Sequence, residues 1–161
     1  MKKTFRPCAG IVVFNKDGLL FLGNRLGLKN AWQFPQGGIE DGETISEAAQ
    51  RELFEETGIK NISIVHVEKE AIRYEFDEDV KSKFKKKGIV SDGQDIYFSL
   101  FYFEGTDEEI NLKCFEQEFD HYVWSDFDFA INNVISFKKE VYQIIAEKFN
   151  PLIKQYLKSN S

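Results

Sequence analysis

The first third of the chain alternates short apolar runs with turn signals, a pattern that predicts strands. Two apolar segments, AGIVVFN (9–15) and LLFLGNR (19–25), flank a Lys-Asp-Gly turn and predict a β-hairpin. The segment AWQFP (31–35) predicts a short strand that its proline ends. QGGIEDGE (36–43) holds three of the eleven glycines, and we expect it to be a loop with unusual backbone demands.

The apolar period then changes to that of a helix over residues 45–57. Thr44 and Glu47 have the spacing of a capping box, which marks the start of this helix. Gly58 stands where a left-handed C-terminal cap belongs. The expected buried stripe consists of Ile45, Ala48, Ala49 and Leu53.

The second half returns to strand patterns and ends on an amphipathic helix. Strands are expected at 62–67, 71–76, 95–105 and 121–125, and a polar excursion with a short helix at 77–88. Within 136–149, Val141, Ile144, Ile145 and Phe149 recur at helical spacing, and Pro151 is expected to interrupt the helix. This order predicts an α/β/α sandwich with a mixed sheet between helices. We expect one domain over 1–161, with a core at about 5–149 and a helical tail at 150–161.

Composition narrows the class of protein. A hydrophobic content of 42% with 16 Phe supports a sizeable core, and 161 residues suit one domain. The net charge of -6 excludes a general nucleic-acid footprint, so a polyanionic substrate needs a local basic patch or a metal ion. No signal peptide or membrane span is expected. Cys8 and Cys114 match no metal spacing and are interpreted as free thiols of a cytoplasmic protein, with a single disulfide as the alternative.

Three glutamates, Glu52, Glu55 and Glu56, lie three and four positions apart on the expected helix. This spacing places the carboxylates on one face, where like charges repel one another. Magnesium prefers carboxylate oxygens, so a divalent cation would relieve the repulsion. A solvated charged face is the alternative.

A longer pattern surrounds these glutamates. Reading G-x5-E-x7-R-E-L-x-E-E-x-G-I, its fixed positions are Gly37, Glu43, Arg51, Glu52, Leu53, Glu55, Glu56, Gly58 and Ile59. The pattern resembles the Nudix box at every defined position. The resemblance implies hydrolysis of nucleoside diphosphates linked to another moiety, on an α/β/α sandwich. It also implies that Arg51 pairs with Glu43 to order the box.

The implied chemistry requires a divalent metal. The expected ligands are Glu52, Glu55 and Glu56, with the backbone of the glycine loop at Gly37 close by. A metal neutralises the diphosphate and lowers the pKa of a bound water. A carboxylate of the same cluster takes the water's proton, and the sequence does not choose between Glu55 and Glu56. We expect Mg²⁺, with Mn²⁺ as a substitute.

The resemblance extends beyond the box. FRPCAGIVVFN, AWQFPQGGIEDGE, the EFD at 118–120 and VISFKKEVYQ are similar to bacterial RNA pyrophosphohydrolases and to asymmetric dinucleoside tetraphosphate hydrolases. This resemblance implies that Glu118 is a further metal ligand, that Arg6 and Arg25 reach phosphates, and that Phe137 and Lys138 hold the first nucleotide. The structural alternatives are that Arg6 only pairs with an acidic neighbour and that Phe137 only packs the last helix against the sheet.

Three departures from the subfamily pattern fall on the substrate side. They are Cys8 after Arg-Pro, GQDIYF (93–98) where a second Gln, a basic residue and a Trp are usual, and IRYEFDED (72–79) in place of a Trp- and Pro-containing segment. Five lysines within Lys81–Lys87 either follow an RNA backbone or form a solvated excursion.

The expected function is removal of pyrophosphate from 5′-triphosphorylated RNA, leaving the 5′-monophosphate that initiates mRNA decay. The alternative is a dinucleoside polyphosphate hydrolase acting on diadenosine tetraphosphate or pentaphosphate. A nucleotide-binding sensor without turnover is a third class, which the intact box glutamates disfavour. Neither a membrane nor DNA is an expected partner, and the sequence leaves protein partners open.

Overall fold

The computed structural model describes residues 2–160. Its strands are β1 (Phe5–Phe14), β2 (Leu20–Arg25), β3 (Trp32–Gln33), β4 (Gln36–Gly38), β5 (Ile62–Val67), β6 (Ile72–Glu75), β7 (Gly93–Phe103) and β8 (Phe119–Ser125). Its α-helices are α1 (Ile45–Thr57), α2 (Glu78–Lys86), α3 (Phe127–Asn133) and α4 (Lys139–Ser159), and single 3-10 turns occupy Asp107–Glu109 and Ser136–Lys138.

The strands form one mixed sheet around the long pair β1 and β7. These two run parallel over ten residue pairs, from Phe5 opposite Gly93 to Phe14 opposite Tyr102. The backbone order is β3-β2-β1-β7-β5, and β4, β6 and β8 pair with β1, β7 and β2 in turn. Because β4 pairs antiparallel with residues 8–10 of β1, the first part of the glycine segment 36–43, residues 36–38, is part of the sheet.

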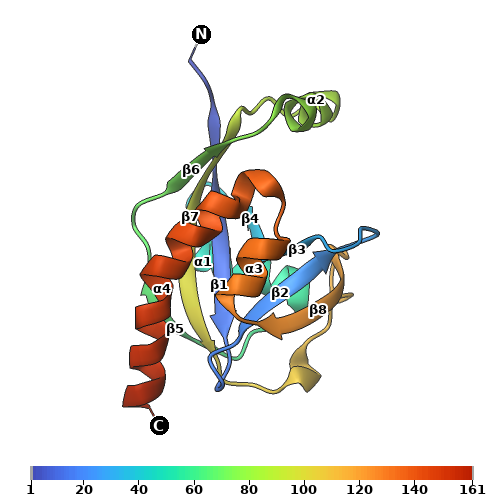
Figure 1. Cartoon of the computed structure of the whole chain (residues 1–161). Coiled ribbons are helices and arrows are strands. Elements are labelled where there is room, and N and C mark those ends of the chain that lie inside the picture. Colours follow the sequence, from blue (N-terminus) through green and yellow to red (C-terminus); the bar gives the residue numbers. More distant parts are fainter. Residues whose placement is uncertain (1, 161) are drawn as a thin grey trace.

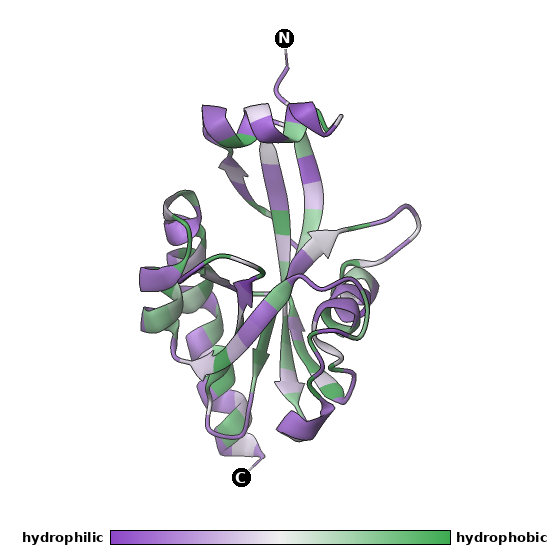
Figure 2. Ribbon diagram, turned by 90° about the vertical axis from the view of Figure 1, so that its right-hand side faces the viewer, coloured by the Kyte–Doolittle hydropathy of each residue, from purple (hydrophilic) through white to green (hydrophobic). Residues whose placement is uncertain are grey.

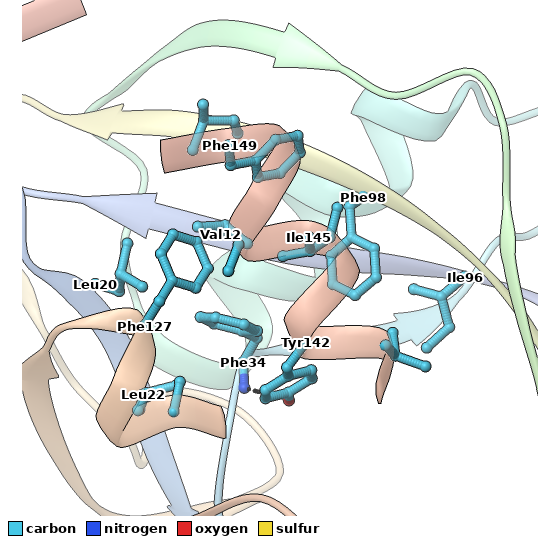
Figure 3. Packing of buried hydrophobic residues seen from close by; sticks show 14 of the residues in the cluster. Val12, Leu20, Leu22, Phe34, Ile96, Phe98, Phe127, Tyr142, Ile145 and Phe149 are labelled. Atoms are coloured by element: carbon cyan, nitrogen blue, oxygen red, sulfur yellow. Dashed lines mark hydrogen bonds between the residues drawn. The ribbon is translucent and has the colours of Figure 1, made fainter. Parts of the chain in front are cut away.

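Helices cover both faces of this sheet, as Figure 1 shows. One face packs against α3 and α4, and the other against α1, through two separate clusters of buried apolar residues. Figure 3 shows the first cluster, in which Phe34 and Tyr142 lie together and the Phe34 N–H donates to Tyr142 Oη over 3.0 Å. The predicted α/β/α sandwich with a mixed sheet is confirmed.

Local sequence signals placed α1 correctly. The helix spans the predicted 45–57, and Thr44 and Glu47 form both hydrogen bonds of a capping box. Gly58 caps its end in the left-handed region, with φ of 77°. The free-thiol interpretation is also confirmed, with Cys8 buried and Cys114 exposed.

Two predictions from turn-forming residues were wrong. Pro151 does not interrupt the last helix, because α4 continues to Ser159 with the proline on its exposed side. Apolar packing beyond the proline offsets the lost hydrogen bond: Ile153 is buried and Tyr156 stacks on Tyr102. The first part of 36–43 is strand β4 rather than loop. Helix α3 had no counterpart among the predicted elements.

The packing of Ile153 gives a test of this continuation. Ile153 is 4% exposed and belongs to the cluster of buried apolar residues between the sheet and helices α3 and α4. Replacing it by alanine removes most of this buried side chain. We expect the free energy of unfolding to fall by about 2–4 kcal/mol. Denaturant titration of this variant beside Lys154→Ala, its exposed neighbour, measures the effect. A change no larger than that of the lysine variant would contradict the packing of this segment on the core.

Candidate active site

Helix α1 holds its acidic residues against the glycine segment. Leu53 and Ala49 are fully buried beneath the sheet and fix the rotation of the helix. That rotation turns Glu52 and Glu56 toward β4, with Glu55 between them at the rim. Glu56 is 6% exposed, which is exceptional for a carboxylate.

Glu56 is the least solvated carboxylate of this group. Its Oε2 is buried and has no hydrogen-bond partner among the described residues. Burial raises the pKa of Glu56 well above its ordinary value, and the nearby Glu52 and Glu118 raise it further. The backbone N–H of Gln36 lowers this pKa in part through a hydrogen bond. An orphaned buried carboxylate oxygen is a group for which a cation would provide the missing partner.

Glu52 lies directly beneath Gly37. A Cβ at Gly37 would stand 2.0 Å from Glu52 Cδ, so the glycine is required by this close approach and not by its φ angle. Burial raises the pKa of Glu52, although the neighbouring Arg51 guanidinium lowers it. The backbone of β4 therefore lies directly against the Glu52 carboxylate.

Arg51 binds the glycine segment to the helix. Its Nε donates to Glu43 Oε2 over 2.8 Å and its Nη2 to Glu43 Oε1 over 3.0 Å, a bidentate pair. The same Nη2 donates to the Gly38 carbonyl over 2.9 Å. Nη1 donates to Glu52 Oε1 over 2.8 Å, so one guanidinium spans the loop and the cleft. The ion pair expected from the box is present in the structure.

The Arg51–Glu43 pair predicts a specific acid sensitivity. The hydrogen bond from Arg51 lowers the pKa of Glu43 to about 2, against an ordinary value of 4.5. The stabilising contribution is therefore present above pH 4.5 and is lost as the pH falls toward about 2. We expect Glu43→Gln to lower Tm by a constant amount at neutral pH and by progressively less between pH 4.5 and 2. Equal melting differences at every pH would contradict this assignment.

The acidic residues share one cleft of about 200 Å³. It is lined by Glu52, Glu55, Glu56, Phe115, Glu116 and Glu118. Glu118, just before β8, approaches closely enough to raise the pKa of both Glu52 and Glu56. Among the described residues, no group of three or more His, Cys, Asp or Glu side chains is already placed to hold a metal ion. Arg51 currently engages Glu52 and Glu55, at 2.8 and 3.4 Å.

The donor set fits a hard divalent cation. The cleft offers carboxylate oxygens alone, which is the ligand type that Mg²⁺ and Mn²⁺ accept. Glu56 supplies an oxygen without a partner, and Glu55 and Glu118 lie near the rim, where side chains can rotate toward it. Glu116 was not expected at this site. No spacing signal marks it, because the segment before β8 reaches the cleft only through the fold.

A second cluster, of cationic and aromatic residues, lies on the other side of β4. Lys138 is 6% exposed, and its Nζ donates to Gln36 Oε1 over 2.9 Å. Burial and the charge of Arg25 lower the pKa of Lys138 to about 8. Phe137 stacks on Tyr74 at 5.5 Å between ring centroids and borders a cleft of about 270 Å³.

Arg6 lies beside this second cluster, where it borders a small pocket together with Gln94. A Cβ at Gly38 would stand 2.5 Å from Arg6 Nη2, so this guanidinium lies against the glycine segment. Within residues 2–160, no ion pair links Arg6 to a carboxylate, which removes the alternative that it only pairs with an acidic neighbour. Phe137 does pack against the sheet through Tyr74, as its structural alternative holds, and it also borders the open cleft.

Gln36, Tyr74 and Gln94 form a polar group that the sequence did not predict. Gln36 Nε2 donates to Gln94 Oε1 over 3.3 Å, and Tyr74 Oη donates to the same oxygen. Gln36 also contacts Lys138 through its side chain and Glu56 through its backbone. In the sequence, only the position of Gln36 beside Gly37 indicated that it belongs to the site. The arrangement can hold a polyphosphate between carboxylate-bound metal and fixed cations.

The chain is similar in sequence to known proteins of one family. A family model described as the NUDIX domain matches residues 4–146. A protein of Wolbachia pipientis from Culex pipiens, named RNA pyrophosphohydrolase, is 40% identical over 154 residues, covering 95% of this chain and 94% of that protein. A Coxiella burnetii protein of the same name is 36% identical over 157 residues, covering 95% of this chain and 68% of that protein.

Solved structures share the fold at low identity. The binary complex of a C. elegans Ap4A hydrolase has a TM-score of 0.64 at 19% identity, covering 91% of this chain and 98% of that one. The E. coli dihydroneopterin triphosphate pyrophosphohydrolase has a TM-score of 0.63 at 18% identity, covering 91% and 99%. Over residues 2–160, the structure contains no helix with the length and apolar character needed to span a bilayer.

Proposed function

This chain belongs to the Nudix hydrolase family, and from that premise we propose that it removes pyrophosphate from the 5′ end of triphosphorylated RNA. The products are 5′-monophosphate RNA and pyrophosphate, and the former initiates mRNA decay. Nudix hydrolases generally use divalent metal ions, and we propose Mg²⁺ here, with Mn²⁺ as a substitute. We place the reaction in the cytoplasm, within a single domain over residues 1–161.

The proposal rests on the contacts that Gln36 makes on its two sides. Its backbone contacts the carboxylate of Glu56, and its side chain contacts the ammonium of Lys138. One residue of β4 thus separates the acidic cleft from the buried cation. A triphosphate laid along β4 would have metal on one side and positive side chains on the other, which is the arrangement that phosphoryl chemistry needs.

The residues of this chain then have separate roles. Glu52, Glu55, Glu56 and Glu118 would hold the metal, with the Gly37 backbone beside them; the metal supplies charge neutralisation and activates water when bound. Glu55 or Glu56 takes the proton of the attacking water as its oxygen bonds to phosphorus and the bond to the leaving pyrophosphate breaks. Arg51 and Glu43 hold the loop in position. Arg6 and Arg25 bind phosphates, and Phe137 and Lys138 hold the first nucleotide.

Lys138 gives this assignment a pH signature. Lys138→Met keeps the length of the side chain but removes the charge, and we expect KM for triphosphorylated RNA to rise about 10-fold or more, the cost of a charge-assisted hydrogen bond. Because the pKa of Lys138 is about 8, KM of the wild type should rise above that pH as the ammonium deprotonates. Lys139→Met, the exposed neighbour, is the control. A wild-type KM that is flat from pH 7 to 9.5 would contradict the role of Lys138.

The alternative substrate is a dinucleoside polyphosphate. It is favoured by the fold shared with the C. elegans Ap4A hydrolase and by the stacked rings of Phe137 and Tyr74, an aromatic surface that a nucleoside could contact. The two substrates differ in the number of linked phosphates and in what lies beyond them, which is an extended strand or a second nucleoside.

A direct comparison separates the two. A short 5′-triphosphate RNA with an unpaired end and diadenosine tetraphosphate are given to the enzyme at equal concentration with Mg²⁺, and kcat/KM is measured for each. We expect the larger value for RNA, with pyrophosphate as the product. A larger value for the dinucleotide, with ATP and AMP as products, would replace the proposed substrate with the alternative.

A further inference from the structure

Helix α2 carries a group of lysines that the site described above does not use. Figure 1 shows the helix beyond the end of β6 and the start of β7, at the same end of the sheet as the start of α4, and the ribbon colours of Figure 2 mark most of its residues as hydrophilic. Lys81 is engaged by Glu75, Glu78 and Asp92 at 3.4–3.7 Å. In contrast, within residues 2–160 no ion pair joins Lys83, Lys85, Lys86 or Lys87 to a carboxylate, and all four are exposed.

The lysines occupy two flanks of the helix. Lys83 and Lys87 are four residues apart and so lie on one side, while Lys81 and Lys85 share the other. The contacts of Lys81 with Glu75 and Asp92 place that second flank over acidic residues of the sheet end. Lys83 and Lys87, the residue that caps the end of the helix, therefore lie on an open flank beside the inward-facing Phe84, and Lys86 is exposed next to them.

A continuous row of aromatic rings connects α2 to the nucleotide side of the site. Phe84 packs on Phe76 at 5.0 Å between centroids, Phe76 on Tyr74 at 5.6 Å, and Tyr74 on Phe137 at 5.5 Å. Phe84 and Phe76 also border a small pocket with Arg6. The lysine-rich half of α2 is thus fixed beside a residue that we assign to phosphate binding, and is not a detached excursion.

We propose that Lys83 and Lys87 bind the phosphate backbone of the nucleotides that follow the 5′ end of the RNA. The inference rests on the proposed function. It adds where the RNA lies on the protein beyond its first nucleotide. The protein carries a net charge of -6, so an open cationic flank next to the site is a local exception that a polyanion would select. On this assignment the flank would contact only the part of a substrate that continues beyond the first nucleotide, so it would favour an RNA strand over a dinucleotide.

The test varies substrate length and salt together. Triphosphorylated RNAs of two and eight unpaired nucleotides are compared with wild type and with Lys83→Gln/Lys87→Gln. Two phosphate contacts to a single strand contribute about 1.4 to the slope of log KM against log salt, or about 7-fold between 50 and 200 mM. We expect the double variant to lose this part of the salt dependence of KM for the eight-nucleotide RNA. For the two-nucleotide RNA, we expect the salt dependence of KM to change much less.

The double variant Lys16→Gln/Lys154→Gln is the matched control, because it removes the same charge from the turn after β1 and from the far part of α4. We expect wild-type KM and salt slope for both RNAs in this control. Equal salt slopes in wild type and in the Lys83/Lys87 variant would overturn the inference while leaving the proposed function intact. Absence of turnover on both RNAs in wild type would instead overturn the proposed function. If the Lys83/Lys87 variant lost only binding to anionic lipid vesicles, the flank would be a membrane surface and the inference would be wrong.

Discussion

Replacing Glu56 by glutamine is expected to lower kcat by about 10²–10⁴-fold, the range for loss of a catalytic carboxylate. The amide keeps the shape of the side chain and still accepts the N–H of Gln36, but it cannot take a proton or offer a charged oxygen to a metal. Steady-state hydrolysis of triphosphorylated RNA with Mg²⁺ measures the loss. Glu116→Gln, which removes the same charge from the rim of the same cleft, is the control. An equal loss in both variants would show a general charge effect and would contradict the specific role of Glu56.

The same substitution should stabilise the metal-free protein. Burial raises the pKa of Glu56, so the folded state favours the protonated form and the charged form costs stability at neutral pH. This cost grows as the pH rises above 4.5, the ordinary value for the group, and is absent below it. We therefore expect a higher Tm for Glu56→Gln at pH 7 and no advantage below pH 4.5. A lower Tm at pH 7 would contradict the interpretation of Glu56 as an unpaired buried carboxylate.

Gly37→Ala is expected to reduce kcat/KM by about 100-fold through displacement of Glu52. The added Cβ would lie 2.0 Å from Glu52 Cδ and 2.3 Å from its Oε2, so either the carboxylate or strand β4 must move. A displacement of this size at a catalytic group typically has such a cost. Because the clash involves only the end of a flexible side chain, we expect the free energy of unfolding to fall by less than about 1 kcal/mol. Kinetics and denaturant titration of the same variant measure the two effects.

Gly42→Ala is the matched control for the glycine segment. Gly42 has φ of 85°, and a Cβ added there would have nothing within 4 Å, so an alanine is strained without touching the site. We expect a stability loss of about 1–2 kcal/mol with kcat/KM near that of wild type. If Gly42→Ala reduced activity as much as Gly37→Ala, the loss would reflect the loop as a whole and not the position of Glu52.

Elements with strong local signals were predicted well from the sequence. The capping box at Thr44 and the glycine at position 58 marked both ends of α1, and the regular apolar runs indicated β1, β2 and the long strand β7. The predicted hairpin is reduced to one residue pair, Phe14 with Leu20, because β1 pairs mainly with β7 and β2 with β8. Such signals involve residues only a few positions apart. Pro151 shows where they fail: its propensity to break a helix was overcome by apolar contacts made by Ile153 and Tyr156 with the distant sheet.

The acidic half of the site was also apparent from spacing, because Glu52, Glu55 and Glu56 share one helix. The cationic half depends on the fold. The hydrogen bond between Lys138 and Gln36 joins residues 102 positions apart, and neither residue type nor spacing predicts it. The burial that lowers the pKa of Lys138 likewise arises only when the start of α4 meets β4. The resemblance to known hydrolases indicated Lys138 as a binding residue, and the structure supplies the contacts on which that role would depend.

The most direct test of the central claim follows the phosphate that leaves. Triphosphorylated RNA labelled at the γ-phosphate is given to the enzyme with Mg²⁺, with Mg²⁺ removed by a chelator, and to Glu56→Gln with Mg²⁺. We predict that the label leaves as pyrophosphate and that the RNA retains a 5′-monophosphate. The chelator should abolish release, and the substitution should slow it by about 10²–10⁴-fold. Release of labelled orthophosphate with a 5′-diphosphate RNA, or release that persists in the chelator, would contradict the proposed reaction.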